Sequence, residues 1–71
     1  MAEELSDADR RALELLRDQD ERFAQTEPSV RAALVRRGLA SVAVGRVGSG
    51  VSLNYTITDR GRTVLEAQRP G

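Results

Sequence analysis

The segment VSLNYTITDRGRTVLEA, residues 51–67, changes its apolar period in the middle, and this change restricts the fold more than any other feature. Apolar residues alternate with polar ones up to Ile57, which is typical of a strand. From Thr58 onward the apolar spacing is helical. We therefore predict a strand that runs directly into a helix over about 59–68. Thr58 is expected to cap that helix, and Gly61 to allow its close approach to the sheet.

A second alternating run precedes this strand. Residues 41–47 read SVAVGRV, and the turn residues GSG follow at 48–50. Two alternating runs joined by three turn residues that include glycine predict a β-hairpin over about 40–57. On its second strand we expect one face to carry the apolar set Val51, Leu53, Tyr55 and Ile57, and the other face to carry Ser52, Asn54 and Thr56.

Two helices are predicted before the hairpin. The first covers about 6–19 and starts with SDAD, a capping-box-like sequence in which Asp9 follows Ser6 by three residues. We assign its apolar face to Ala8, Ala12, Leu15 and Leu16, with Leu5 and Leu13 at the margins. Residues 20–26 form either a helical turn around Phe23 or a short strand, and Phe23 is expected to anchor them to the core.

The second helix covers about 27–37. Thr26 is a candidate cap, and Pro28 is tolerated in the first helical turn. Gly38 is expected to end the helix in the left-handed conformation, with Leu39 packing back on it. The inward residues are expected to be Val30, Ala33 and Leu34, and two cations, Arg36 and Arg37, lie in the last turn, where they complement the helix dipole.

Composition limits the chemistry of this 71-residue chain, for which we expect a single α+β domain over 1–71. It has no cysteine and no histidine, which removes disulfides, thiolate metal sites and the commonest general base. The sequence GRVGSG at 45–50 resembles a phosphate-binding loop, but it lies in a predicted hairpin rather than between a strand and a helix. We expect no enzyme activity, no cofactor and no metal. The chain also has no long apolar run, so we expect a cytoplasmic protein with no membrane partner.

The formal net charge is zero, but the two parts of the chain differ in sign. Residues 1–27 hold nine acids against four arginines, a formal charge of −5, and residues 28–71 hold seven arginines against two acids, a charge of +5. Such asymmetry favours an anionic partner.

The order helix, helix, hairpin, helix resembles a winged-helix domain of the kind found in MarR-type small transcription regulators. The residues that carry the resemblance lie in two segments, ALVRRGLA and YTITDRGRTVL: Leu34, Gly38, Leu39, Tyr55, Ile57, Thr58, Gly61, Arg62 and Leu65. They fall within residues 28–66, just over half of the chain. The eight residues between Gln19 and Pro28 are too few for a normal second helix and turn, so the helix-turn-helix is shortened.

The resemblance implies binding of double-stranded DNA in transcription regulation. In a winged helix, the exposed side of residues 28–37 enters the major groove and the hairpin tip reaches the adjacent backbone. With Val30 and Leu34 inward, a helical wheel places five residues outward: Ser29, Arg31, Ala32, Val35 and Arg36. The expected DNA contacts are Ser29, Arg31, Arg36, Arg46 and Ser49.

The alternative is a protein-interaction module, because a fold does not fix its function. The small residues Ala32 and Val35, between Arg31 and Arg36, then form the centre of an interface with a polar rim. A chain this short also resembles small phage or mobile-element proteins that bind and modulate a host protein. The sequence leaves a homodimer open, through Val64 and Leu65 or through the hairpin.

Overall fold

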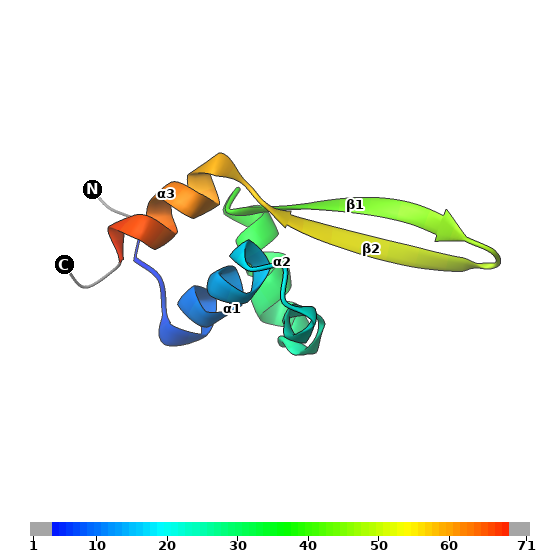
Figure 1. Cartoon of the computed structure of the whole chain (residues 1–71), viewed down its shortest axis with the longest axis horizontal. Helices are drawn as coiled ribbons and strands as arrows, with labels where there is room; N and C mark the ends of the chain where they lie inside the picture. The colour runs from blue at the N-terminus through cyan, green and yellow to red at the C-terminus, as the bar shows by residue number, and fades with distance from the viewer. Residues whose placement is uncertain (1–3, 69–71) are drawn as a thin grey trace.

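The protein, described by a computed structural model over residues 4–68, has an α+β structure in which helices form one end and a hairpin projects from them (Figure 1). Its principal extents are 46 × 20 × 19 Å. The predicted α+β class and hairpin are confirmed, and each helix lies inside its predicted range. The elements are α1 (Asp7–Arg17), the 3₁₀ helix η1 (Glu21–Gln25), α2 (Pro28–Arg36), β1 (Ala40–Val47), β2 (Gly50–Ile57) and α3 (Asp59–Ala67).

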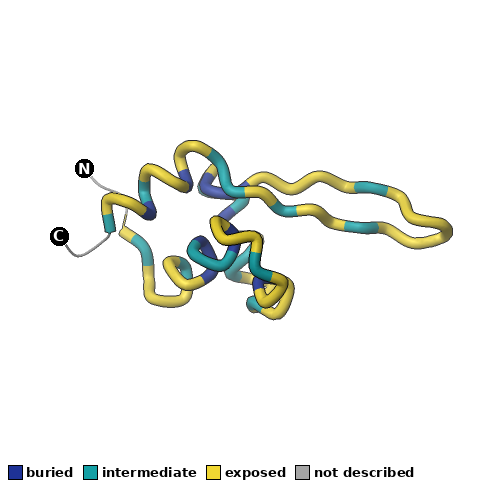
Figure 2. The backbone as a smooth tube through the Cα atoms, in the orientation of Figure 1, coloured by how far each residue is buried: buried dark blue, intermediate teal, exposed yellow. Residues whose placement is uncertain are grey.

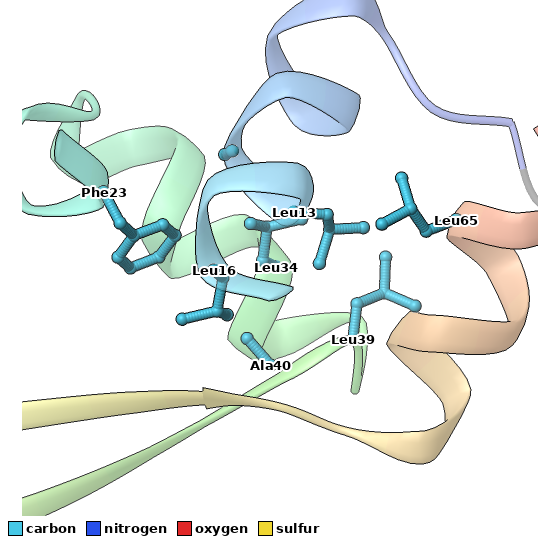
Figure 3. Close-up of a cluster of buried hydrophobic side chains, with 8 residues drawn as sticks. Leu13, Leu16, Phe23, Leu34, Leu39, Ala40 and Leu65 are labelled. Carbon is cyan, nitrogen blue, oxygen red and sulfur yellow. The ribbon is translucent and has the colours of Figure 1, made fainter. Parts of the chain in front are cut away.

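The hydrophobic core lies between the three α-helices and the base of the hairpin. Leu13 of α1, Leu34 of α2 and Leu39, just before β1, are completely buried, and Figure 3 shows their side chains converging with that of Leu65 from α3 (Figure 3). Aliphatic side chains therefore make most of the core, as the near absence of aromatic residues requires. The buried set is Ala12, Leu13, Leu16, Phe23, Leu34, Leu39, Ala40 and Leu65.

The buried face of α1 is rotated from the predicted one. Leu13, which we expected at the margin, is at the centre of the core, whereas Ala8 is exposed and Leu15 is half-buried. The rotation has a physical reason, because burying a leucine removes much more apolar area from water than burying an alanine. The predicted capping box is confirmed: the Ser6 hydroxyl accepts from the Asp9 amide at 3.1 Å, and the Asp9 carboxylate accepts from the Ser6 amide at 3.4 Å.

The connection between α1 and α2 is a short 3₁₀ helix, which decides between the two forms that the sequence left open. Phe23 is buried, as predicted, and its ring meets that of Tyr55 edge-on with the centroids 5.3 Å apart. The Asp20 carboxylate caps η1 by accepting from the backbone amide of Arg22 at 2.9 Å. A single large apolar residue is enough to fix so short a segment, which has no second apolar position for a helical stripe.

The two ends of α2 differ in how they are capped. Glu27, rather than Thr26, is the N-cap, and no side chain accepts a hydrogen bond there; Pro28 occupies the first turn. The C-terminal end matches the prediction, since Gly38 has a φ of +76° and Leu39 is completely buried. The Leu39 amide donates to the carbonyl of Leu34 at 2.9 Å, which together with the positive φ makes a Schellman-type end.

The hairpin is fully antiparallel, with Ala40 opposite Ile57 at its base and Val47 opposite Gly50 at its tip. Its turn therefore contains two residues, Gly48 and Ser49, rather than the three predicted, because Gly50 is already paired. Gly48 has a φ of +59°, which glycine adopts without steric cost, and a positive φ at the first turn position matches the twist of the strands.

Candidate functional site: the hairpin and its groove

Thr58 fixes the direction in which the hairpin leaves the helices. Its hydroxyl donates to the carbonyl of Gly38 at 2.7 Å and accepts from the amide of Gly61 at 2.9 Å, as predicted for a helix cap. Its own amide donates to the carbonyl of Leu39 at 3.2 Å. One residue thus joins the end of α2, the end of β2 and the start of α3.

Gly61 allows α3 to lie directly against the start of β1, as the sequence predicted. A Cβ atom at this position would overlap the backbone carbonyl of Leu39 and would lie 2.9 Å from Cγ1 of Ile57. Because the main obstacle is backbone, no side-chain rotation relieves it. The base of the hairpin therefore lies close against α3.

One face of the hairpin is apolar from its base to Leu53, and near the tip it carries Arg46 opposite Val51. Paired residues of an antiparallel ribbon share a face, so the register places Val42 with Tyr55 and Val44 with Leu53 on the same side. This confirms the alternation predicted for β2. The opposite face carries Ser41, Ala43, Ser52, Asn54 and Thr56, together with Gly45, Val47 and Gly50.

The helices cover only the base of this apolar face. Near the base, Tyr55 and Ile57 are half-buried and pack against the core. Farther out the ribbon is uncovered, and Figure 2 shows it as mostly exposed backbone beyond the helices (Figure 2). Four aliphatic residues of this outer half are largely exposed: Val44 (68%), Val47 (70%), Val51 (69%) and Leu53 (55%).

A groove of about 460 Å³ runs along β2 at the inner end of this exposed region. Five consecutive residues of the strand, Leu53 to Ile57, line it. Since successive side chains of a strand point to opposite faces, a groove lined by all five follows the strand's edge, not one of its faces. The remaining wall comes from α1, η1, α2 and α3: Leu16, Arg17, Gln19, Asp20, Glu21, Phe23, Ala24, Arg31 and Arg62.

Arg31 lies at this groove and is not directed outward, which corrects the sequence prediction. Its guanidinium lies over the ring of Tyr55, 5.8 Å from the centroid, and the residue is half-buried. Its buried Nε has no hydrogen-bond partner among residues 4–68. The cation–π contact explains the orientation, because a tyrosine face attracts a guanidinium. Val35, also expected outward, is half-buried and packs against the core.

The other four residues predicted to contact DNA are exposed. Ser29 and Arg36 lie on α2, Arg46 lies near the hairpin tip, and Ser49 lies in the turn. Arg36 and Arg46 make no ion pair within the described part of the chain. No hydrogen bond or ion pair joins any two of these four side chains within residues 4–68.

Three acids of the N-terminal part pair with arginines of the same part. Arg10, Arg17 and Arg22 pair with Asp7, Asp18 and Asp20 at 3.5, 3.0 and 2.8 Å. The side-chain and backbone hydrogen bonds from Arg22 lower the pKa of Asp20 from its ordinary value of 3.8 to about 2. Asp20 is therefore a structural cap that stays ionised.

One ion pair joins elements far apart in the sequence. Arg37, just after α2, donates to Asp9 at the start of α1 at 3.1 Å and to the carbonyl of Glu4 at 2.8 Å. This arginine holds two helix ends together and is occupied by that role.

Between residues 4 and 68, no cluster of three or more His, Cys, Asp or Glu side chains is arranged to hold a metal ion. Over the same residues, no helix is long and apolar enough to cross a bilayer. Searches against protein-family models, curated proteins and solved structures return no match to this chain.

Sequence reasoning did not identify the exposed apolar residues Val44, Val51 and Leu53 as a candidate site. Their alternation predicted a strand with one apolar face, and such a face is ordinarily covered. The length of the predicted strands could have indicated the exposure, because a hairpin of two eight-residue strands extends beyond the area that the short helices of this chain can cover.

Proposed function

We propose that this protein is a protein-interaction module and that the outer half of its hairpin is the binding element. The observation that carries the proposal is the exposure of Val44, Val47, Val51 and Leu53 on a projecting ribbon. Exposed apolar surface on a small protein marks an interaction site when it is contiguous. Here Val44 and Leu53 face each other across the strands, and Val51 follows on the same face with Arg46 opposite it. Val47 adds exposed apolar area on the other face of the ribbon.

The charge of the hairpin favours a protein over a nucleic acid as its partner. Within residues 40–57, Arg46 is the only charged residue. Affinity for nucleic acid depends mainly on the number of phosphates that lysine and arginine neutralise. By contrast, the centres of protein interfaces are depleted of charge and rich in large apolar side chains. The outer hairpin has the second composition.

A photo-crosslinking amino acid at Val51 tests this proposal in cells that make the protein. We expect covalent adducts with protein from position 51 and none from a matched probe at Ser29, which is exposed on α2. The Ser29 variant controls for random collision, since both positions are open to solvent. Absence of any protein adduct from position 51, or equal adducts from both positions, contradicts the proposal.

DNA binding by a winged-helix-like arrangement is the second candidate. It is supported by the order of the elements, with η1 in place of a full second helix, and by the exposure of Ser29 and Arg36 on α2 and of Arg46 on the hairpin. In this candidate α2 lies in the major groove and the hairpin reaches the neighbouring backbone. Ala32, in the middle of the exposed side of α2, has no hydrogen-bonding group for the bases.

Fluorescence anisotropy with mixed-sequence duplex DNA distinguishes this candidate from the first. If α2 contacts phosphates, binding weakens steeply with salt, and Arg36→Ala reduces the slope of log K against log salt by about 1. Arg11→Ala is the matched control, because Arg11 is exposed on α1, away from the proposed DNA surface. No binding by micromolar protein at low salt excludes DNA as the partner.

A further inference from the structure

We propose that the partner of the hairpin is a second copy of this chain, and that the β2 strands of the two copies pair antiparallel about a twofold axis at Leu53. The product is a four-stranded sheet in which the two β1 strands are the outer edges. This inference rests on the proposed function, because it names the partner of the same surface.

The free edge of β2 lacks the features that keep edge strands single. Isolated proteins protect such edges with charged residues, proline or bulges, because unpaired amides and carbonyls otherwise bind another strand. Gly50–Ile57 contains no charged residue and no proline, and all eight of its residues pair in regular register with β1. A two-stranded ribbon is also only marginally stable, and further strands stabilise it.

The same strand carries both halves of a self-complementary surface. The inner half of β2, Leu53–Ile57, lines the groove, and the outer half, Gly50–Leu53, is uncovered. Antiparallel pairing therefore lays the outer half of each copy in the groove of the other. Leu53 belongs to both halves, which places the twofold axis at this residue. An interface of this kind closes on itself and stops at two copies.

The side chains match in this register. Val51 of one copy lies beside Tyr55 of the other, on the face where Phe23 already covers the tyrosine. Val51 thereby extends the buried cluster of the second copy, and the two Leu53 side chains meet at the axis. Ser52 lies beside Asn54 on the opposite face, so that polar side chains meet polar ones.

The charges of the groove also fit an uncharged occupant. Five charged residues line it. Arg17 and Asp20 are paired with Asp18 and Arg22, Arg31 lies over the ring of Tyr55, and Glu21 and Arg62 add one charge of each sign. A strand without charge places no unpaired ion against these pairs. β2 is such a strand, whereas a strongly acidic or basic peptide would compete with them.

Sedimentation equilibrium of the purified full chain tests the proposal through two matched variants. The wild type is expected to reach twice the 7.8 kDa mass of the chain as its concentration rises. Leu53→Lys places two like charges at the axis and is expected to weaken the dimer by at least about 100-fold. Ala43→Lys is the control, since Ala43 is exposed on β1 and lies on the face opposite Leu53. We expect its dimer constant to stay within about threefold.

Cysteine cross-linking tests the register without adding charge. The chain contains no cysteine, so a single Leu53→Cys substitution introduces one thiol per copy. At the twofold axis the two thiols lie opposite each other and are expected to form an intermolecular disulfide on mild oxidation. Ala43→Cys, on the outer strand of the four-stranded sheet, is expected to remain monomeric on a non-reducing gel.

Three results overturn the inference: a wild type that stays monomeric up to millimolar concentration, a Leu53→Lys dimer as stable as the wild type, or equal loss in both lysine variants. Circular dichroism verifies that each variant folds. If Leu53→Lys does not fold, the two cysteine variants test the proposed register instead. The photo-crosslinking experiment at Val51 distinguishes failure of the dimer proposal from failure of the proposed interaction function. An adduct of two chains supports the second copy, whereas an adduct with a different protein overturns it and leaves the hairpin an interaction element.

Discussion

Gly61→Ala is the substitution whose effect the structure specifies most closely. The new methyl group would overlap the carbonyl of Leu39 and press on Ile57. Overpacking that forces backbone to move costs about 1–3 kcal/mol. A shift of α3 also weakens the hydrogen bond from the Gly61 amide to Thr58, and a lost cap costs about 1 kcal/mol. Against this, alanine favours a helix over glycine by at most about 1 kcal/mol.

The net loss for Gly61→Ala is therefore about 2 kcal/mol, which corresponds to a fall of roughly 10 °C in Tm for a domain of this size. Urea unfolding followed by circular dichroism measures it. Gly45→Ala is the matched control, because a Cβ there meets no atom closer than 3.9 Å. We expect that variant within about 1 kcal/mol of the wild type. Equal stability of the Gly61→Ala variant and the wild type would refute the close contact between α3 and Leu39.

Three further predictions concern single side chains. Thr58→Ala, which removes a hydroxyl that both donates and accepts, should destabilise the protein by about 1–2 kcal/mol in urea unfolding, whereas Thr58→Ser should cost less than about 0.5 kcal/mol. Arg37→Ala should lower the free energy of unfolding by about 1–2 kcal/mol, because it removes the bonds that hold the start of α1. The control Arg36→Ala should change it by less than about 0.5 kcal/mol, and similar losses in both variants would contradict the bridging role of Arg37. Asp20 should titrate with a midpoint near 2 in an NMR experiment that follows its carboxyl group. Its contribution to stability is therefore present above its ordinary pKa of 3.8 and is lost as the pH falls through 2. A midpoint near 3.8 would mean that the hydrogen bonds from Arg22 do not persist in solution.

The sequence predicts the elements well where the determining interactions are local. Thr58 caps α3, Ser6 caps α1 and Gly38 ends α2, because each of these roles needs only neighbours within a few residues. The same holds for the faces of β2, which follow from alternation alone.

Features that depend on distant parts of the chain were predicted less well. The rotation of α1 toward Leu13 depends on where the side chains of α2 and α3 leave space. Arg31 turns toward Tyr55 although a helical wheel places it outward, because the hairpin base lies beside α2 and supplies an aromatic ring. Arg37 appeared only as a cation near a helix end, and its partner at Asp9 lies 28 residues away.

The candidate site illustrates the same limit. Composition shows that β2 has no charge, but exposure of Leu53 and the presence of a groove along the strand edge depend on how far the helices reach. The residues proposed from resemblance lie elsewhere, at Ser29 and Arg36 on α2 and at the hairpin tip. The two proposals thus use different surfaces of the molecule, which makes them separable by mutation.

Amide hydrogen exchange in the outer half of β2 tests most directly whether this half of the hairpin pairs with a second copy of the chain. On a ribbon that stays uncovered, the outward amides of Val51–Leu53 exchange rapidly at every protein concentration. We predict that their exchange slows as the protein is concentrated and remains fast in the Leu53→Lys variant at the same concentrations. Exchange that is equally fast in both proteins at every concentration would contradict a self-associating hairpin.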